Sequence, residues 1–377
     1  MDRHNRALAV FGLVLACSVG VATSQGSTAS TASDFDAKAA AAYLDARAES
    51  WSAWPNAQRD RGTFCISCHT TLPYALARPE LRASLGERQP SGAESKILNN
   101  LLYRARNWRE VEPFYSDQTR GIPKTSESRA IEAVMNAVVL SRRDARNGHL
   151  SSDTRTAFEV MWSLQMKTGP NNGAWTWLNF NYEPWESPDS PYFGASLAAI
   201  AVGSAPDAYA ASPDIADNVK ALRAYFARQH STVSLLNQLM GLWASGTMPD
   251  LLGAAQRKAT IDAAFAAQQA DGGWSTSSLG SYQRSDKTSN NAASDGYGTA
   301  LACLALQVAG VSDPRVENGL DWLRRHQDRV TGRWVATSLN KERDPATEPG
   351  KFMNDAATAY AVLALTYQQK ADSAAVE

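Results

Sequence analysis

The sequence predicts an all-α protein, in which a ring of about five or six helix pairs, an (α/α) toroid, follows an irregular segment with the motif Cys-x-x-Cys-His. Two observations predict the ring. Helices that are apolar nearly all round alternate along the chain with amphipathic helices that end in an aromatic-x-x-Gln pattern. In addition, a Gly-x-Trp sequence follows three of these endings. Such self-similarity is typical of repeat architectures, in which each unit buries its apolar face on its neighbours.

The N-terminus of the 377-residue chain has the pattern of an export signal. Arg3 and Arg6 precede an apolar run from Ala7 to Ala22, which is short for a membrane span of about 20 residues. A retained anchor helix is the alternative. We therefore expect a periplasmic or otherwise exported protein with four regions: a signal peptide over 1–24, a Ser/Thr-rich linker over 25–35, a helical segment with the cysteine motif over 36–122, and the toroid over 123–377.

Cys17 lies inside the apolar run and allows a further interpretation, that of a lipoprotein cysteine. The Ser/Thr-rich stretch behind it would then serve as a flexible tether. Leu15 is not typical of that signal. Membrane attachment is expected only if Cys17 is lipidated.

Composition excludes one class of partner. The chain has 37 basic and 38 acidic residues, and its formal net charge is −1. Nucleic-acid binding requires a basic face, so we expect no nucleic-acid partner. Apolar residues make up 44% of the chain, which is enough for a large core.

The motif Cys65-x-x-Cys68-His69 is the signature of covalent haem attachment. Both thiols add to the haem vinyl groups, and the histidine becomes an iron ligand. We expect haem c bound through Cys65 and Cys68, with His69 on the metal. A chance match is improbable because cysteine is rare in this chain, and three alternatives stay open at this point. They are a redox dithiol, a zinc site and a small disulfide. No alternating strand pattern precedes the motif, as a redox dithiol would require, and no second cysteine pair completes the four ligands of a zinc site.

The sequence does not identify the second axial ligand of the iron. An open sixth position would favour the binding of a small molecule, whereas a methionine or histidine there would favour electron transfer. Cys303 lies in an apolar helical run and is expected to be an inert core residue.

The predicted helices follow in order. The first covers Ala37–Trp51, an irregular stretch covers Trp54–Pro79, and another helix covers Glu94–Trp108. A helix that is apolar on all sides must be buried on all sides, so the apolar class forms the inner layer of the ring and the amphipathic class the outer layer. The outer helices end at Gln165, Gln229, Gln268 and Gln327, and the inner helices begin at Glu127, Ser190, Leu235, Ser294 and Asn354.

The Gln-x-x-x-Gly-x-Trp pattern resembles the QW repeat of squalene–hopene cyclases and the related prenyltransferase β-subunits. Gln268–Trp274 matches it, Gln327–Trp334 carries one extra residue, and Gln165–Trp175 carries four. The resemblance covers roughly Thr125 to Gln368. It implies an (α/α) toroid in which the glutamine caps the next helix and the tryptophan packs over it, so the motif is structural.

Neither active site of these families is present in the sequence. Squalene–hopene cyclases protonate an alkene with an Asp-x-Asp-Asp cluster, whereas the nearest string, Ser294–Gly298, holds one aspartate. Prenyltransferases of this fold bind zinc with Asp, Cys and His, but no histidine is placed to join Cys303. The resemblance therefore implies a shared scaffold and no transferred chemistry.

Candidate catalytic residues come from the starts of the inner helices, which should surround a central cavity. The stretch Ala174–Phe193 is rich in aromatic residues beside carboxylates. Aromatic walls suit apolar or polyene ligands, and carboxylates in apolar surroundings serve as acids. Alternatively, the aromatic stretch is a structural plug and the Asp, Ser and Asn residues are N-caps. The candidates are Glu186, Asp189, Asp295, Tyr297 and Asp355.

Several functions fit these observations. The first is an exported c-type haem protein on a squalene-cyclase-like toroid, which binds an apolar or isoprenoid ligand or performs redox chemistry on it. The second is a non-enzymatic haem protein that transfers electrons to a periplasmic redox partner or serves as a binding module. A polysaccharide-acting toroid enzyme and a hopene-type cyclase are further alternatives, which leave the haem motif or the missing acid cluster unexplained. The sequence does not decide whether the protein is an enzyme.

Overall fold

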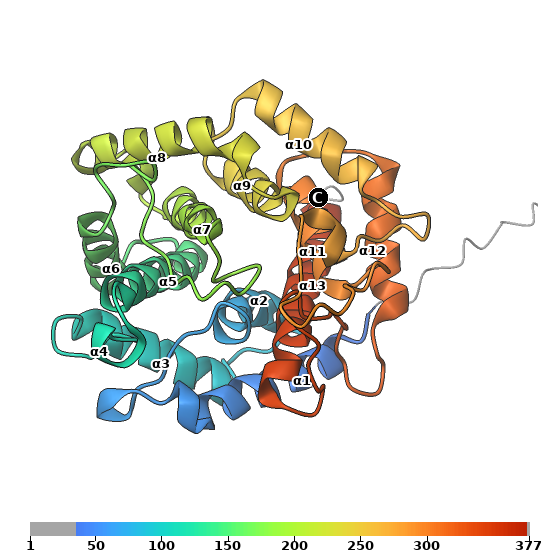
Figure 1. Ribbon diagram of the computed structural model, residues 1–377, viewed down its shortest axis with the longest axis horizontal. Helices are drawn as coiled ribbons and strands as arrows, with labels where there is room; N and C mark the ends of the chain where they lie inside the picture. The colour runs from blue at the N-terminus through green and yellow to red at the C-terminus, as the bar shows by residue number, and fades with distance from the viewer. Residues whose placement is uncertain (1–34, 375–377) are drawn as a thin grey trace, which may run out of the picture. The chain divides into compact units, whose positions relative to one another are not determined.

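The computed structural model describes residues 35–374, with side chains to residue 367. The predicted signal peptide, Cys17 and all but the last residue of the predicted linker lie outside the described residues. Within the described part, six outer helices alternate with six inner helices and no strand occurs. Each inner helix packs against the next, and α13 returns to α2, so the inner helices form a closed ring (Figure 1). The predicted all-α toroid is confirmed.

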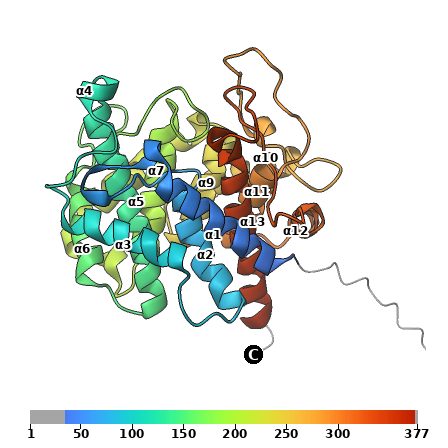
Figure 2. The same cartoon turned by 90° about the horizontal axis from the view of Figure 1, so that it is seen from below.

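The helices pair along the chain as outer and then inner. The outer helices are α1 (Ala37–Ala53), α3 (Gly92–Arg106), α6 (Ser152–Ser163), α8 (Ala216–Gln229), α10 (Ala254–Ala266) and α12 (Pro314–His326). The inner helices are α2 (Thr71–Ser84), α5 (Lys124–Asn147), α7 (Ser190–Ser204), α9 (Leu235–Thr247), α11 (Gly296–Val308) and α13 (Glu348–Ala374). A short helix, α4 (Asp117–Arg120), precedes α5. Figure 2 shows α4 and the long loops between the last helices rising from one side of the ring.

Small residues let the inner helices approach each other closely. A Cβ on Gly203 of α7 would lie 2.4 Å from the carbonyl oxygen of Thr247 at the end of α9. A Cβ on Gly246 of α9 would lie 2.3 Å from the carbonyl oxygen of Val308 in α11. Both distances are too short for any side chain, so the glycines set the spacing between neighbouring inner helices. Cys303 of α11 is fully buried in this layer, as expected.

The three Gln…Gly-x-Trp motifs form the same clamp. In each, the glutamine amide donates hydrogen bonds of 2.7–3.0 Å to the carbonyl of the motif glycine and to a carbonyl at the start of the next outer helix. The tryptophan Nε1 donates a bond of 2.6–2.8 Å to a carbonyl near the end of the preceding outer helix. The glutamine acceptors are Gly173 and Asn218 for Gln165, Gly272 and Arg315 for Gln268, and Gly332 and Asp36 for Gln327.

The third clamp closes the ring. Gln327 follows α12, but its next outer helix is α1, whose N-cap Asp36 accepts the amide proton and donates its own N–H to Gln327 Oε1. Gly332 has a φ of +78°, and a Cβ there would lie 2.1 Å from the carbonyl oxygen of Ala39. The motif thus joins the C-terminal end of the repeat to the first helix of the described chain.

Two of the helix predictions need correction, one at α2 and one at the start of α13. The stretch predicted as irregular contains α2, which begins at Thr71 and includes Pro73 and Pro79. Pro73 lies in the first turn, where a backbone N–H would have no helical acceptor, so its missing donor is tolerated. Every residue from 71 to 81 is buried, so packing offsets the cost of Pro79. The segment 36–122 supplies α1, α2 and α3, and these helices pack with the rest of the ring. Finally, α13 begins at Glu348, six residues before the predicted Asn354.

No helix within residues 35–374 is long and apolar enough to cross a membrane.

Replacement of Gly332 by alanine should destabilise the ring more than replacement of Gly310. Gly310 has a similar φ of +74°, but a Cβ there meets nothing within 4 Å. Gly310→Ala should lower the free energy of unfolding by about 1–2 kcal/mol through the left-handed backbone alone. Gly332→Ala should cost a further ~1–3 kcal/mol because α1 must move away. Denaturant unfolding of both variants measures the difference, and equal costs would show that this contact does not hold the ring closed.

Candidate functional site

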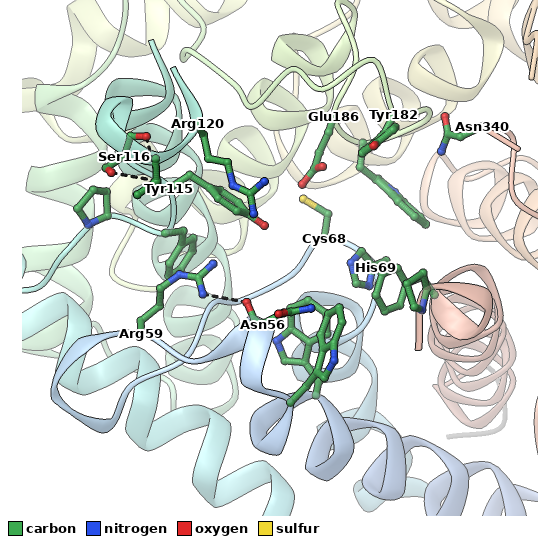
Figure 3. Close-up of a pocket in the computed structure, with 18 of the residues that line it drawn as sticks. Asn56, Arg59, Cys68, His69, Tyr115, Ser116, Arg120, Tyr182, Glu186 and Asn340 are labelled. Atoms are coloured by element: carbon green, nitrogen blue, oxygen red, sulfur yellow. Dashed lines mark hydrogen bonds between the residues drawn. The ribbon is translucent and has the colours of Figure 1, made fainter. Parts of the chain in front are cut away.

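A cavity of about 1140 Å³ opens on the side of the ring where α2, α5 and α13 begin (Figure 3). Its volume reaches the upper end of the range for ligand pockets in proteins, about 1,000 Å³. Aromatic side chains form much of its wall: Trp51, Trp54, Phe114, Tyr115, Tyr182, Trp185 and Phe352. The Cys-x-x-Cys-His motif contributes Cys68 and His69 to the same wall.

The aromatic stretch Ala174–Phe193 fills the mouth of the ring below this cavity. Trp185 Nε1 donates a 3.1 Å hydrogen bond to the Tyr297 hydroxyl in α11, and the two rings meet at 5.4 Å. Tyr297 in turn packs edge-on against Tyr360 of α13. Trp177 lies over Gly194, where a Cβ would come within 2.2 Å of the indole ring. The stretch therefore acts as the predicted plug, and the open space lies above it.

Three neighbouring helices hold the motif backbone in place. Asn100 of α3 bonds both the N–H and the carbonyl of Phe64, at 2.9 and 3.0 Å. Trp51 of α1 donates from Nε1 to the Cys65 carbonyl at 2.7 Å. Arg104 of α3 donates to the Thr63 hydroxyl at 2.7 Å and forms a buried ion pair with Glu132 of α5. The segment before α2 is thus fixed on both sides of the first cysteine.

His69 has the hydrogen bonding of a metal-ligating histidine. Its Nδ1 lies 2.8 Å from the Thr70 hydroxyl, which donates its own proton to Asp355 at 2.7 Å. The Thr70 oxygen can therefore only accept from His69, so Nδ1 carries the proton and Nε2 has a free lone pair. No described residue bonds to Nε2. A partner on the second nitrogen is what fixes the tautomer and orientation of histidines that bind metals.

The surroundings of His69 keep the ring neutral and oriented. The ring stacks on Phe352 of α13 with centroids 3.7 Å apart, and it meets Trp51 edge-on at 5.0 Å. Burial, with smaller contributions from Arg47 and Arg343, lowers the pKa of His69 to about 3. A neutral imidazole is the form that ligates metals.

Asp355 of α13 connects three helices behind His69. Its carboxylate accepts hydrogen bonds from Tyr43 and Arg47 of α1 at 2.8 Å each, in addition to the bond from Thr70. Arg47 also bonds Glu348 at the start of α13. Burial disfavours the Arg47 charge, but the bonds to Asp355 and Glu348 outweigh this and raise the pKa of Arg47. The charge on Asp355 is thus paired, as a buried carboxylate requires.

The two motif cysteines are free thiols, so the small disulfide does not form. Burial raises the pKa of Cys65 to about 12 and that of Cys68 well above its ordinary value. Reactive dithiols need a lowered pKa, so this environment disfavours a thiol redox site. Within residues 35–367 no group of three or more His, Cys, Asp or Glu side chains is placed to hold a metal ion.

Glu186 projects from the plug toward Cys68 in the cavity (Figure 3). Its backbone pairs with Tyr182, but no described residue hydrogen-bonds or ion-pairs with its carboxyl group. Burial raises the pKa of Glu186 to about 7, and Lys124 lowers it slightly. The group can therefore hold or release a proton near neutral pH, which is what a general acid or base requires.

The other four candidate residues do not line the cavity. Asp295 is the N-cap of α11 and accepts bonds from Thr276 and from the N–H groups of Tyr297 and Gly298, as the N-cap interpretation predicted. Tyr297 is fully buried beneath the plug, and Asp355 acts behind His69. Asp189 is exposed at the start of α7 without a capping hydrogen bond. Asp189 and Asp295 lie off the cavity because it opens where α2, α5 and α13 begin, whereas these two residues precede α7 and α11.

Sequence reasoning missed several residues of the cavity wall. Arg59, Tyr115 and Arg120 come from loops and from the single turn of α4, and no periodicity marks such positions. Phe352 was missed because α13 begins earlier than its apolar pattern. Thr70 could have been found, since it directly follows the expected iron ligand.

Glu186→Gln should change how stability depends on pH. The pKa of Glu186 is about 7 in the folded protein and near its ordinary value of 4.5 when unfolded, so unfolding releases a proton between these values. Stability should therefore fall as pH rises from about 4.5 to 7, by up to roughly 1.4 kcal/mol per pH unit. The Glu186→Gln variant should lack this decline. Its free energy of unfolding at pH 8 should exceed that of the wild type by up to about 3 kcal/mol.

Denaturant unfolding at several pH values measures this difference. Glu159→Gln on the exposed face of α6 is the matched substitution. Parallel profiles for Glu186→Gln and the wild type would contradict the raised pKa.

Comparison with known proteins covers part of the ring. The family model of the squalene-hopene cyclase C-terminal domain matches residues 235–353, which run from α9 into α13. No curated protein matches the chain. Among solved structures, a glycosidase is 13% identical with a TM-score of 0.45, over 87% of this chain and 98% of that one. Over residues 235–353 this chain is therefore similar to the C-terminal domain of squalene–hopene cyclases.

Proposed function

We propose that the protein is an exported c-type haem protein whose toroid presents the haem to an apolar ligand, with isoprenoids as the expected class. Cys65 and Cys68 would carry the thioether bonds, and His69 would ligate the iron. One observation carries this proposal. The unbonded Nε2 belongs to a histidine on the wall of a large cavity, and Nδ1–H is fixed by Thr70 and, through it, by Asp355.

The residues present suit covalent haem, with one required movement. Cys68 and His69 both line the cavity. Cys65 is buried behind them, with its sulfur near the Ile66 carbonyl, so its side chain would have to turn toward the cavity to form the second thioether. When bound, haem would supply redox chemistry at this wall. The buried, unactivated thiols agree with a structural attachment role and not with thiol catalysis.

The cavity wall favours an apolar ligand beside the haem position. Tryptophan and phenylalanine rings cover large areas without needing hydrogen bonds, and their faces suit alkenes and other polarisable groups. Trp54, Trp185 and Phe352 all contribute to the wall. The likeness to squalene-hopene cyclases over residues 235–353 supports the scaffold, and the isoprenoid class is our extension of it.

Glu186 would supply acid–base chemistry in this cavity. Its carboxyl group has no partner among the described residues, so a bound ligand is free to accept its hydrogen bond. The pKa of about 7 lets Glu186 hold a proton on one carboxyl oxygen or take one up at neutral pH. The aromatic wall lowers the local polarity, which strengthens such an interaction.

The reduced pyridine haemochrome spectrum of the purified full-length protein tests the attachment. After expression with haem-maturation machinery, the wild type should show a c-type spectrum that survives denaturation. The variant with Cys65→Ala and Cys68→Ala should lose it, whereas Cys303→Ala should keep it, since that thiol is buried in α11. A colourless wild-type protein from a competent host would remove the haem from the proposal.

Carbon monoxide and squalene distinguish a ligand-binding haem from an electron carrier. The cavity wall holds no histidine other than His69 and a single methionine, Met353, within the described residues. We expect carbon monoxide to bind the reduced protein and squalene to shift its absorption. A six-coordinate, low-spin spectrum that neither compound changes would favour the electron-transfer function instead.

Thr70→Val should raise the midpoint potential of the haem. The hydrogen bond from Nδ1–H makes the imidazole a stronger donor and favours the ferric state, so its loss favours the ferrous state. Thr71→Val is the matched control, because Thr71 is equally buried and bonds Ser67 but not His69. Spectroelectrochemical titration should show a shift in Thr70→Val only. Equal potentials in both variants would contradict a positioning role for Thr70.

A further inference from the structure

Two arginines lie against the ring of one tyrosine in the cavity wall. The guanidinium carbon of Arg59 lies 5.2 Å from the centroid of the Tyr115 ring, and that of Arg120 lies 5.6 Å from it. All three residues line the cavity. Figure 3 shows them grouped on one side, with His69 on the other side and Cys68 between. The two positive charges are thus held in place by one aromatic ring.

Neither arginine has an acidic partner among the described residues. Arg59 uses Nη1 to donate to the backbone carbonyls of Asn56 and Gln58, and its buried Nε has no partner. Arg120 has its contact with the Tyr115 ring and forms no described ion pair. Glu112 and Asp117 also line this part of the cavity, but Asp117 Oδ1 accepts from the N–H of Thr125. Guanidinium groups with unused donors in a partly enclosed site are the usual partners of carboxylates.

We propose that Arg59 and Arg120 form a carboxylate-binding site, which holds the acidic end of whatever occupies the cavity. Two sources have this chemistry. One is the propionate groups of the porphyrin, and this source rests on the function proposed above. The other is the carboxylate of a free apolar acid. In haem the propionates lie on the edge opposite the vinyl groups. In the cavity, the arginine pair lies on the side of Cys68 opposite to His69.

The position of Tyr115 explains why the site would select an amphipathic ligand. Its ring contacts both guanidinium groups and gives them a common apolar support. A carboxylate can then reach a guanidinium donor while the rest of the ligand lies against the aromatic wall. Charge-assisted hydrogen bonds of this kind contribute about 1.5–3 kcal/mol each, which corresponds to roughly ten- to hundredfold in affinity.

Arg120→Gln is the main test variant, because Arg120 is exposed and has no described hydrogen bond to lose. Arg59→Gln is the second variant, and Arg88→Gln, an exposed arginine that does not line the cavity, is the control. All are made in the full-length, haem-loaded protein. The midpoint potential is measured by spectroelectrochemical titration. Binding of decanoate and of decanol is measured through the fluorescence of the wall tryptophans.

Each source has its own result. If the site holds propionates, Arg120→Gln and Arg59→Gln lower the midpoint potential, because lost positive charge favours the more positive ferric haem, and decanoate binds no better than decanol. If the site holds a free acid, the midpoint potential stays unchanged and decanoate binds better than decanol. Either variant then weakens decanoate binding by about tenfold or more. The proposal is overturned if both Arg120→Gln and Arg59→Gln have the same midpoint potential and the same decanoate affinity as Arg88→Gln.

The same experiment separates this site from the haem proposal. A protein without a pyridine haemochrome spectrum has lost the proposed function, and its potential cannot be measured. The decanoate and decanol comparison still applies to that protein, because the arginine pair does not depend on the thioether bonds. Preference for decanoate in wild type, lost in Arg120→Gln, would then support the site alone.

Discussion

The buried carboxylate of Asp355 is the interaction on which the rest of the site depends. It lies in α13 and accepts hydrogen bonds from Tyr43 and Arg47 of α1 and from Thr70 at the start of α2. One charge therefore joins the last inner helix to the first helix pair, where the ring closes. Because a buried carboxylate without partners is very costly, this geometry is strongly specified. The same set of bonds fixes the tautomer of His69, so closure of the fold and orientation of this imidazole have one physical cause.

The ring serves as a scaffold whose interior is already occupied. The repeated clamps use backbone carbonyls as acceptors, so they specify how outer helices follow each other and leave the inner surface unconstrained. Trp185 and Tyr297 then fill the mouth of the ring. The open volume lies between this plug, the Cys68–His69 wall and the loop of Tyr115. The ring thus offers a cavity whose wall comes largely from loops, with Phe352 and Met353 contributed by α13.

The sequence predicted the ring because its signals are local and repeated. Apolar periodicity identifies each inner helix. The glutamine, glycine and tryptophan of the clamp stand close together in the sequence, from Gln268 to Trp274. It failed at α2, where Pro73 and Pro79 suggested irregular structure and long-range burial prevailed. For the site, the cysteine motif located His69 and the aromatic stretch located Glu186, since both lie in conspicuous local patterns. Asp355 was selected for the wrong reason, as a helix start. Its partners Tyr43 and Arg47 are about 300 residues away in the chain, a pairing that no local pattern reveals.

The clamp between Gln327 and Asp36 has a consequence for the order of events during biogenesis. It joins positions 291 residues apart, and the Asp355 bonds span a similar separation. Contacts of such high sequence separation form late, after nearly the whole chain is available. Until then the segment with both motif cysteines lacks the helix that covers it, and the sulfur of Cys65 is not yet enclosed. Covalent attachment of haem to these thiols, as proposed above, is therefore expected to precede docking of the last helices.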